Sequence, residues 1–198
     1  MAGGVRAGID WPRSLAARGA QALHAAHLRP AQRQARAAAL HCFVLDCSAS
    51  MLAAERLALA KGMLAELLAQ VYRWRDRAAV LGFGGAGIDV WQAPGPAAVR
   101  HAPWLAAIGG GGGTPLADAL RAADALLARH RQGPRWLWLL SDCRSRQAPA
   151  RPRHAEHIRL LDFDLARPPL GQAVALAQSW GAVHCPAPRP ARPGADKA

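Results

Sequence analysis

Residues 41–50 read HCFVLDCSAS, in which an apolar run is followed directly by the pattern D-x-S-x-S. A short apolar run of this kind predicts a buried strand. From about Leu52 to Trp74, apolar residues recur at spacings of three and four, which predicts an amphipathic helix. The beginning of the folded region is therefore expected to be a strand, a polar turn and a long helix.

The rest of the chain continues this alternation. Strands are expected at residues 77–83, 88–92, 136–140, 158–163 and 182–185, and helices at 97–108, 115–130 and 169–180. Helices between solidly apolar strands indicate an α/β fold whose sheet is covered on both faces. We therefore predict a doubly wound fold with a mostly parallel central sheet, helices on both faces and one antiparallel edge strand.

The composition fits one globular domain with a basic arm and a tail. The chain has 198 residues, 52% of them hydrophobic, which is enough to bury a core. We expect a partly helical Ala/Arg-rich arm at residues 1–39, the α/β domain at 40–186 and a disordered tail at 187–198. No signal core, apolar span, C-x-x-C pair or zinc-finger spacing is visible, so a cytoplasmic protein without membrane contact is expected.

Hard oxygen ligands lie next to three of the expected elements. Asp46, Ser48 and Ser50 follow the first strand, Asp142 follows the strand at 136–140, and Thr114 opens the helix at 115–130. Ligands of open α/β sheets bind outside the carboxyl ends of the strands, so these side chains are expected at one rim. Two carboxylates and three hydroxyls suit Mg²⁺. The alternative is that each residue only caps a helix or turn, which would place three independent caps at one rim.

The order of these motifs resembles the von Willebrand factor A (integrin I-like) domain and its metal-ion-dependent adhesion site. Within that superfamily, residues 40–186 are similar to the C-terminal domain of the D subunit of magnesium chelatase and cobaltochelatase. The matching strings are FVLDCSASM at 43–51, AKG at 60–62, WRDR at 74–77, GGGTPLA at 111–117 and LLSD at 139–142. The ATPase half of a full D subunit is absent from this sequence.

The resemblance implies a metal site completed by another molecule. The hydroxyls would bind the ion directly, some carboxylate contacts would run through water, and a partner carboxylate would fill the free position. Members of this family usually carry Gly where this chain has Ala49 and Cys143. The residues that would hold Mg²⁺, with Mn²⁺ as a substitute, are Asp46, Ser48, Ser50, Thr114 and Asp142.

The function implied by the resemblance is that of a non-catalytic, metal-dependent interaction subunit. Its partners would be an AAA+ ATPase subunit, chelatase I-type or MoxR-type, and the large tetrapyrrole-binding subunit of a chelatase. The complex would insert Co²⁺ or Mg²⁺ into a tetrapyrrole ring. The residues expected to contact the partner are Gly112, Gly113, Arg144 and Arg146.

Two other functions stay open at this point. An adaptor for a MoxR-type AAA+ chaperone would use the same metal site with a different client. The formal net charge of +12 would also suit an Arg-rich nucleic-acid-binding protein, although no recognition motif supports this. We find no nucleophile–base pair with credible spacing and expect no catalytic residue.

Two further patterns have simpler interpretations. Residues 82–87, GFGGAG, match G-x-G-x-x-G, but a strand rather than a helix is expected after them, which indicates a hairpin and not a dinucleotide site. The glycine run at 109–113 has no P-loop lysine. Cys47 and Cys143 flank the expected metal ligands and could form a redox latch, but we favour two packing residues.

Overall fold

The computed structural model describes residues 9–30, 37–85, 87–97, 103–113, 115–145 and 148–188. The chain divides into two compact units, residues 1–37 and 38–198. In the first unit, helix α1 (Trp11–Arg18) begins after Asp10, whose side chain accepts a hydrogen bond from Arg13 N. The Ser14 hydroxyl donates to Asp10 O and accepts from Arg29 N, which joins α1 to the segment after the short helix η1 (Ala25–His27).

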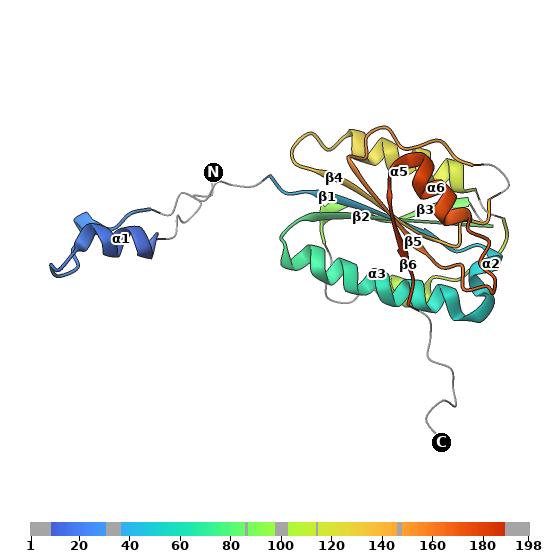
Figure 1. Ribbon diagram of the computed structural model, residues 1–198, viewed down its shortest axis with the longest axis horizontal. Helices are drawn as coiled ribbons and strands as arrows, with labels where there is room; N and C mark the ends of the chain where they lie inside the picture. The colour runs from blue at the N-terminus through green and yellow to red at the C-terminus, as the bar shows by residue number, and fades with distance from the viewer. Residues whose placement is uncertain are drawn as a thin grey trace, which may run out of the picture. The chain divides into compact units, whose positions relative to one another are not determined.

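The second unit is built on one six-stranded sheet with the order β3-β2-β1-β4-β5-β6 (Figure 1). All neighbouring strands are parallel except β2 and β3, which form an antiparallel hairpin at one edge. This confirms the predicted fold class. The strands are β1 (Leu40–Asp46), β2 (Arg77–Gly84), β3 (Gly87–Pro96), β4 (Arg135–Ser141), β5 (His157–Asp162) and β6 (Val183–Pro186).

Helices cover both faces of this sheet, as Figure 1 shows for α5 and α6 on one side and α3 on the other. Alternate residues of β1 enter two separate cores: Cys42 and Val44 pack with α5 and α6, while Phe43 and Leu45 pack with α3. The helices are α2 (Ala49–Leu52), η2 (Ala53–Glu55), α3 (Arg56–Arg73), α4 (Pro103–Ala107), α5 (Leu116–Ala128) and α6 (Gln172–Trp180). None of the described helices is long and apolar enough to cross a membrane.

The helices differ from the sequence-based expectation mainly at their starts. The helix expected from Leu52 begins earlier, at Ala49, and is split into α2, η2 and α3. Ala53 is extended, with ψ of 141°, and ends α2, while Glu55 is left-handed, with φ of 57°, and separates η2 from α3. Helix α6 begins at Gln172, three residues later than expected, after Gly171 with φ of 71°. Helix α4 covers only the second half of the expected span 97–108, of which residues 98–102 lie outside the described residues.

The start of β1 is fixed by a buried polar chain. Trp138 Nε1 donates to His41 Nδ1 over 3.1 Å, so the ring proton of a neutral His41 lies on Nε2, which is 3.4 Å from Asp76 Oδ2. Asp76 Oδ1 accepts a hydrogen bond from Ala39 N. These contacts connect β1, β4 and the turn after α3 within the core, where the sequence predicted a buried Trp136–Leu140 strand.

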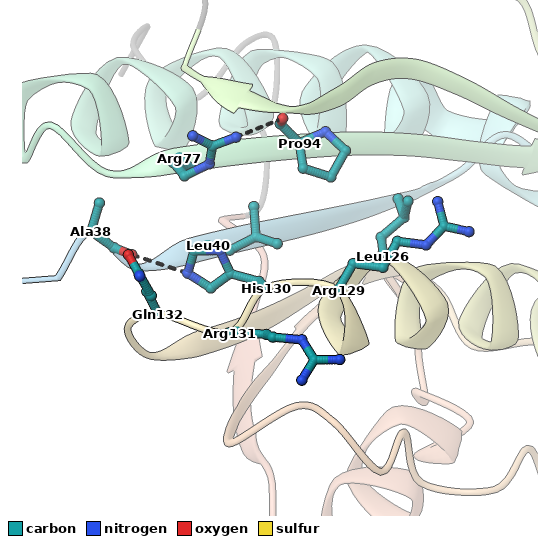
Figure 2. A pocket seen from close by; sticks show the side chains of 9 residues that line it. All are labelled: Ala38, Leu40, Arg77, Pro94, Leu126, Arg129, His130, Arg131 and Gln132. Atoms are coloured by element: carbon teal, nitrogen blue, oxygen red, sulfur yellow. Dashed lines mark hydrogen bonds between the residues drawn. The ribbon is translucent and has the colours of Figure 1, made fainter.

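A basic pocket of about 460 Å³ lies at the edge of the sheet where β1 and β2 begin (Figure 2). Its lining includes Arg77, Arg129 and Arg131 but no described carboxylate. Arg77 donates a hydrogen bond to Pro94 O, and His130 Nε2 contacts Ala38 O at 3.1 Å. None of the described residues that were predicted to bind metal lines this pocket, because they lie at the opposite, carboxyl ends of the strands.

Candidate metal site

The carboxyl ends of β1 and β4 lie at the same end of the sheet, which is called this edge below. They bring together two aspartates that are far apart in the sequence. The strands pair in parallel, with Leu45 opposite Leu140, so Asp46 and Asp142 each lie at or just beyond the end of adjacent strands. Asp46 is completely buried. Its Oδ1 accepts from Ser48 N over 2.8 Å, and its Oδ2 accepts from the Ser141 hydroxyl over 2.5 Å.

The two serine hydroxyls lie beside this carboxylate. Ser48 Oγ is 3.1 Å from Ser50 Oγ. Ser48 occupies the N-cap position of α2, yet its side chain makes no capping hydrogen bond. The local explanation for Ser48, that it serves only to cap a helix, is therefore not supported. Its hydroxyl oxygen retains lone pairs for another ligand.

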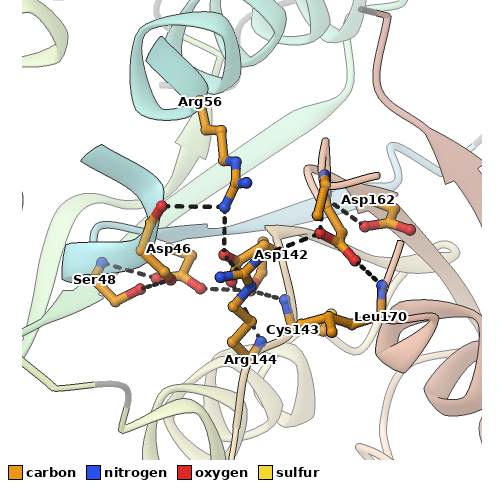
Figure 3. A network of polar contacts seen from close by, with 12 residues as sticks. Asp46, Ser48, Arg56, Asp142, Cys143, Arg144, Asp162 and Leu170 are labelled. Carbon is orange, nitrogen blue, oxygen red and sulfur yellow. Dashed lines mark hydrogen bonds and ion pairs between the residues drawn. The ribbon is translucent and has the colours of Figure 1, made fainter. Parts of the chain in front are cut away.

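Asp142 is buried between two arginines that reach it from different elements (Figure 3). Arg56 Nη1 donates to Asp142 Oδ2 over 3.2 Å, and Arg144 Nε lies 3.3 Å from the same oxygen. Arg144 N donates to Asp142 Oδ1. Arg144 Nη2 also donates to Asp164 Oδ1 over 3.3 Å, which links the end of β4 to the loop after β5.

Burial makes the charge of Asp46 unfavourable. It raises the pKa of this carboxyl above its usual value; hydrogen bonds from Ser141 and Ser48 lower the pKa by less, and the nearby Asp142 carboxylate raises it further. A cation at this edge would offset both burial and repulsion.

The glycine loop at residues 109–113 is held against this edge by backbone contacts. Gly85 N donates to Gly111 O over 2.6 Å, Gly111 N donates to Cys47 O over 2.8 Å, and Ala49 N donates to Gly112 O over 3.3 Å. A Cβ atom on Gly85 would lie 2.6 Å from Gly112 Cα, so only glycine permits this approach. The G-x-G-x-x-G string is confirmed as a hairpin, and its glycines hold this loop close to the D-x-S-x-S turn.

The predicted metal ligands are brought together as far as the structure describes them. Asp46, Ser48, Ser50 and Asp142 share one edge, while Thr114 lies outside the described residues. Gly113 and Pro115, on either side of Thr114, line a recess of about 690 Å³, called the rim recess below, together with Arg144. Of the other predicted partner-binding residues, Gly112 packs on Gly85, and Arg146 lies outside the described residues.

The donor set fits a hard cation only if hydroxyl oxygens take part. Among the described residues, no group of three or more His, Cys, Asp or Glu side chains could hold a metal ion. Two carboxylates and two serine hydroxyls do converge here, and oxygen ligands with few charges suit Mg²⁺.

Comparisons with known proteins show the family to which this domain belongs. A profile of the von Willebrand factor type A domain matches residues 42–144, from β1 to just beyond the second aspartate. The chain belongs to this family. It is 41% identical over 104 residues to the magnesium-chelatase 60 kDa subunit of Cereibacter sphaeroides, covering 52% of this chain and 18% of that protein. It is 37% identical over 125 residues to an uncharacterized protein of Mycobacterium tuberculosis, covering 60% and 20%. The chain spans about one fifth of the length of these relatives.

Solved structures share the fold of this von Willebrand factor A domain. An aerotolerance-related membrane protein from Bacteroides fragilis superposes with a TM-score of 0.61 at 16% identity, covering 75% of this chain and 90% of that one. The PilB minor pilin from Streptococcus sanguinis gives 0.58 at 10% identity, covering 78% and 58%. At these identities the likeness concerns the fold alone.

The two cysteines beside the candidate metal site are packing residues. Cys47 belongs to the α3 core and Cys143 to the α5/α6 core, and neither forms a disulfide. Burial raises the pKa of both thiols to about 12, so the reactive thiolate is scarce at neutral pH.

Cys143 has a φ of 54°, a left-handed conformation that glycine adopts without strain. This explains physically why glycine suits the position after Asp142.

Sequence analysis missed three residues of this network: Arg56, Ser141 and Asp164. The burial of Arg56 could have been inferred from the sequence, because this residue lies four positions before Ala60 on the apolar stripe of α3. A buried arginine needs a negatively charged partner. Ser141 was seen only as part of the string before Asp142. Asp164 follows β5, whose carboxyl end lies beside that of β4, so its place at this edge follows from the strand order.

Proposed function

We propose that this edge of the domain is a metal-ion-dependent adhesion site for Mg²⁺, with Mn²⁺ as a substitute. The residues that would hold the ion are Asp46, Ser48, Ser50, Thr114 and Asp142. The observation that carries the proposal is the convergence of a buried Asp46 carboxylate, two hydroxyl oxygens 3.1 Å apart and Asp142 at the ends of adjacent strands. When bound, the ion would supply a Lewis-acidic position for a carboxylate oxygen of another protein.

The chain's own residues would prepare that position in three ways. Ser141 and Ser48 N orient the Asp46 carboxylate through hydrogen bonds. The glycine contacts hold the loop that leads to Thr114. The rim recess, whose lining includes both Arg144 and Asp118, gives a partner's side chain a concave approach to this edge. None of these groups needs to take part in bond making, so the proposed role is binding without catalysis.

The proposed partners are an AAA+ ATPase subunit of a chelatase-type complex and the large tetrapyrrole-binding subunit of that complex, in the insertion of Co²⁺ or Mg²⁺ into a tetrapyrrole. Support comes from the similarity to magnesium-chelatase subunits, which includes 40% identity over 81 residues to the 67 kDa subunit of Chlorobaculum parvum. The matched segment is 13% of that protein, so the role of the whole complex belongs to the proposal.

Capture of the ATPase subunit on the immobilised chain tests this role. We expect binding in Mg²⁺ that is lost in EDTA and in Ser48→Ala. Ser179→Ala removes a serine hydroxyl that bonds to Leu176 O within α6 and is not a proposed ligand, and this variant should bind like the wild type. Capture that survives both EDTA and Ser48→Ala would contradict the proposal. A MoxR-type ATPase tested in parallel distinguishes a chaperone adaptor from a chelatase subunit.

A further inference from the structure

Arg56 is a buried cation placed between two segments of the proposed metal site. It begins α3, and its side chain is 8% exposed. Its Nη1 donates both to Ser50 O over 3.3 Å and to Asp142 Oδ2 over 3.2 Å. Within the described part of the chain, Asp142 is the only carboxylate within 4.0 Å of this guanidinium. A buried guanidinium at this distance offsets part of the negative charge of its carboxylate partner.

Arg144 adds a second positive charge at the same carboxylate. Its Nε lies 3.3 Å from the oxygen that Arg56 contacts, and its backbone N–H donates to the other oxygen of Asp142. Both oxygens of Asp142 are thus occupied by the chain's own donors. Arg56 Nε is buried and has no hydrogen-bond partner among the described residues, and Arg144 Nε, although close to Asp142 Oδ2, does not form a hydrogen bond with it.

We propose that Arg56 and Arg144 act as internal cations that compete with the divalent ion for Asp142. This inference rests on the proposed metal site and deepens it. A divalent ion at this edge would share Asp142 with two guanidinium groups and would find only Asp46 uncompensated. The domain would therefore hold Mg²⁺ weakly by itself, and a partner carboxylate would supply the missing negative charge. Metal and partner would then bind cooperatively, each strengthening the other by the same factor.

Direct titration of Mg²⁺ into the purified chain, by calorimetry, tests the competition. Arg56→Gln keeps a polar side chain but removes the charge, and we expect it to bind Mg²⁺ about tenfold more tightly than the wild type, because a cation close to the ion is lost. Arg144→Gln should bind about threefold more tightly, since its charge is shared with Asp164 and partly exposed to water. Arg73→Gln, which removes the same charge from the other end of α3, should leave the affinity unchanged.

A second titration tests the cooperativity with a simple carboxylate. Replacing chloride by acetate at constant ionic strength should tighten Mg²⁺ binding to the wild type. The effect should be smaller in Arg56→Gln, where Asp142 is less neutralised. An acetate effect of the same size in Arg56→Gln would contradict the proposal, because the arginines would then not set the demand for an outside carboxylate.

The outcomes separate this inference from the proposed site. If the wild type binds Mg²⁺ and neither arginine variant binds it more tightly, the competition is refuted while the site stands. If Arg56→Gln binds Mg²⁺ and the wild type does not, the competition is supported. If none of the proteins binds Mg²⁺ or Mn²⁺, the proposed site is refuted and the inference with it. Should Arg56→Gln fail to fold, the partly exposed Arg144 provides the same comparison.

Discussion

The Ser141 hydroxyl donates to Asp46 Oδ2 over 2.5 Å and accepts from Cys143 N over 2.8 Å. One side chain thereby joins the end of β1 to the turn after β4. Both aspartates of the proposed site depend on this connection, since Asp46 lies at one end of it and Asp142 lies between Ser141 and Cys143. Ser141 is thus a positioning residue that need not touch the metal itself.

Ser141→Ala should lower the free energy of unfolding by about 2 kcal/mol, because a buried carboxylate oxygen and a backbone N–H both lose their partner. Chemical denaturation with and without Mg²⁺ measures the effect. Ser179→Ala, whose hydroxyl bonds only to Leu176 O among the described residues, serves as the control. A loss no larger than that of Ser179→Ala would show that Ser141 does not hold the edge together.

Cys143 should be the rare position where glycine is more stabilising than alanine. Its φ of 54° strains any residue with a Cβ, so Cys143→Gly should be more stable than Cys143→Ala by about 1 kcal/mol. Cys42, buried in the middle of β1, is the matched control. At this position Cys42→Ala should be more stable than Cys42→Gly by a similar amount. Thermal unfolding of the four variants gives both differences. The same order at both positions would disprove the strain argument.

Gly85→Ala should displace the glycine loop. The added Cβ would lie 2.6 Å from Gly112 Cα, and backbone cannot yield as a flexible side chain can. We expect a loss of roughly 2 kcal/mol in stability and a smaller Mg²⁺-dependent rise in melting temperature. Gly62→Ala, with open space around the new Cβ in α3, should instead be slightly stabilising. A Gly85→Ala protein with wild-type stability and metal response would exclude the proposed role of the hairpin.

The contact between Asp124 and His154 should make stability depend on pH. Burial alone would raise the pKa of Asp124. Two hydrogen bonds lower it, one from His154 N over 2.7 Å and one from the His154 ring over 2.9 Å, and the charge of the ring lowers it further. The net result is a pKa below the usual value of an aspartate. Because the folded pKa is the lower one, the stabilisation is present above the unfolded value and is lost as the pH falls through the folded pKa. Wild type and Asp124→Asn should therefore differ by up to about 1 kcal/mol near pH 5, and the difference should shrink as the pH falls below the usual pKa of an aspartate. A constant difference over this range would contradict the assignment.

The sequence allowed the fold to be predicted because burial and periodicity agree along most of the chain. The run at 41–45 is buried at every position, and the stripe from Leu57 to Val71 packs on the sheet as expected. Element starts were less predictable. The break at Glu55 depends on a local left-handed conformation, which a regular apolar stripe does not reveal.

The site was predictable to the extent that strand order determines it. Asp46 and Asp142 had to meet, because both follow neighbouring parallel strands. The contacts of Arg56 and Arg144 with Asp142 were harder to infer. The position of Arg56 on an apolar stripe indicates burial, but it does not identify the carboxylate with which this arginine pairs. The turn strain at Cys143 likewise depends on φ, which only the structure supplies.

The melting temperature in Mg²⁺ and in EDTA, compared among four proteins, tests the central claim most directly. The wild type and Glu66→Gln, which removes an exposed carboxylate from α3, should both melt at a higher temperature in Mg²⁺ or Mn²⁺. Asp46→Asn and Ser48→Ala, each lacking one proposed ligand, should show no such rise. An equal rise in all four proteins, or no rise in either the wild type or Arg56→Gln, would contradict a metal site at the ends of β1 and β4.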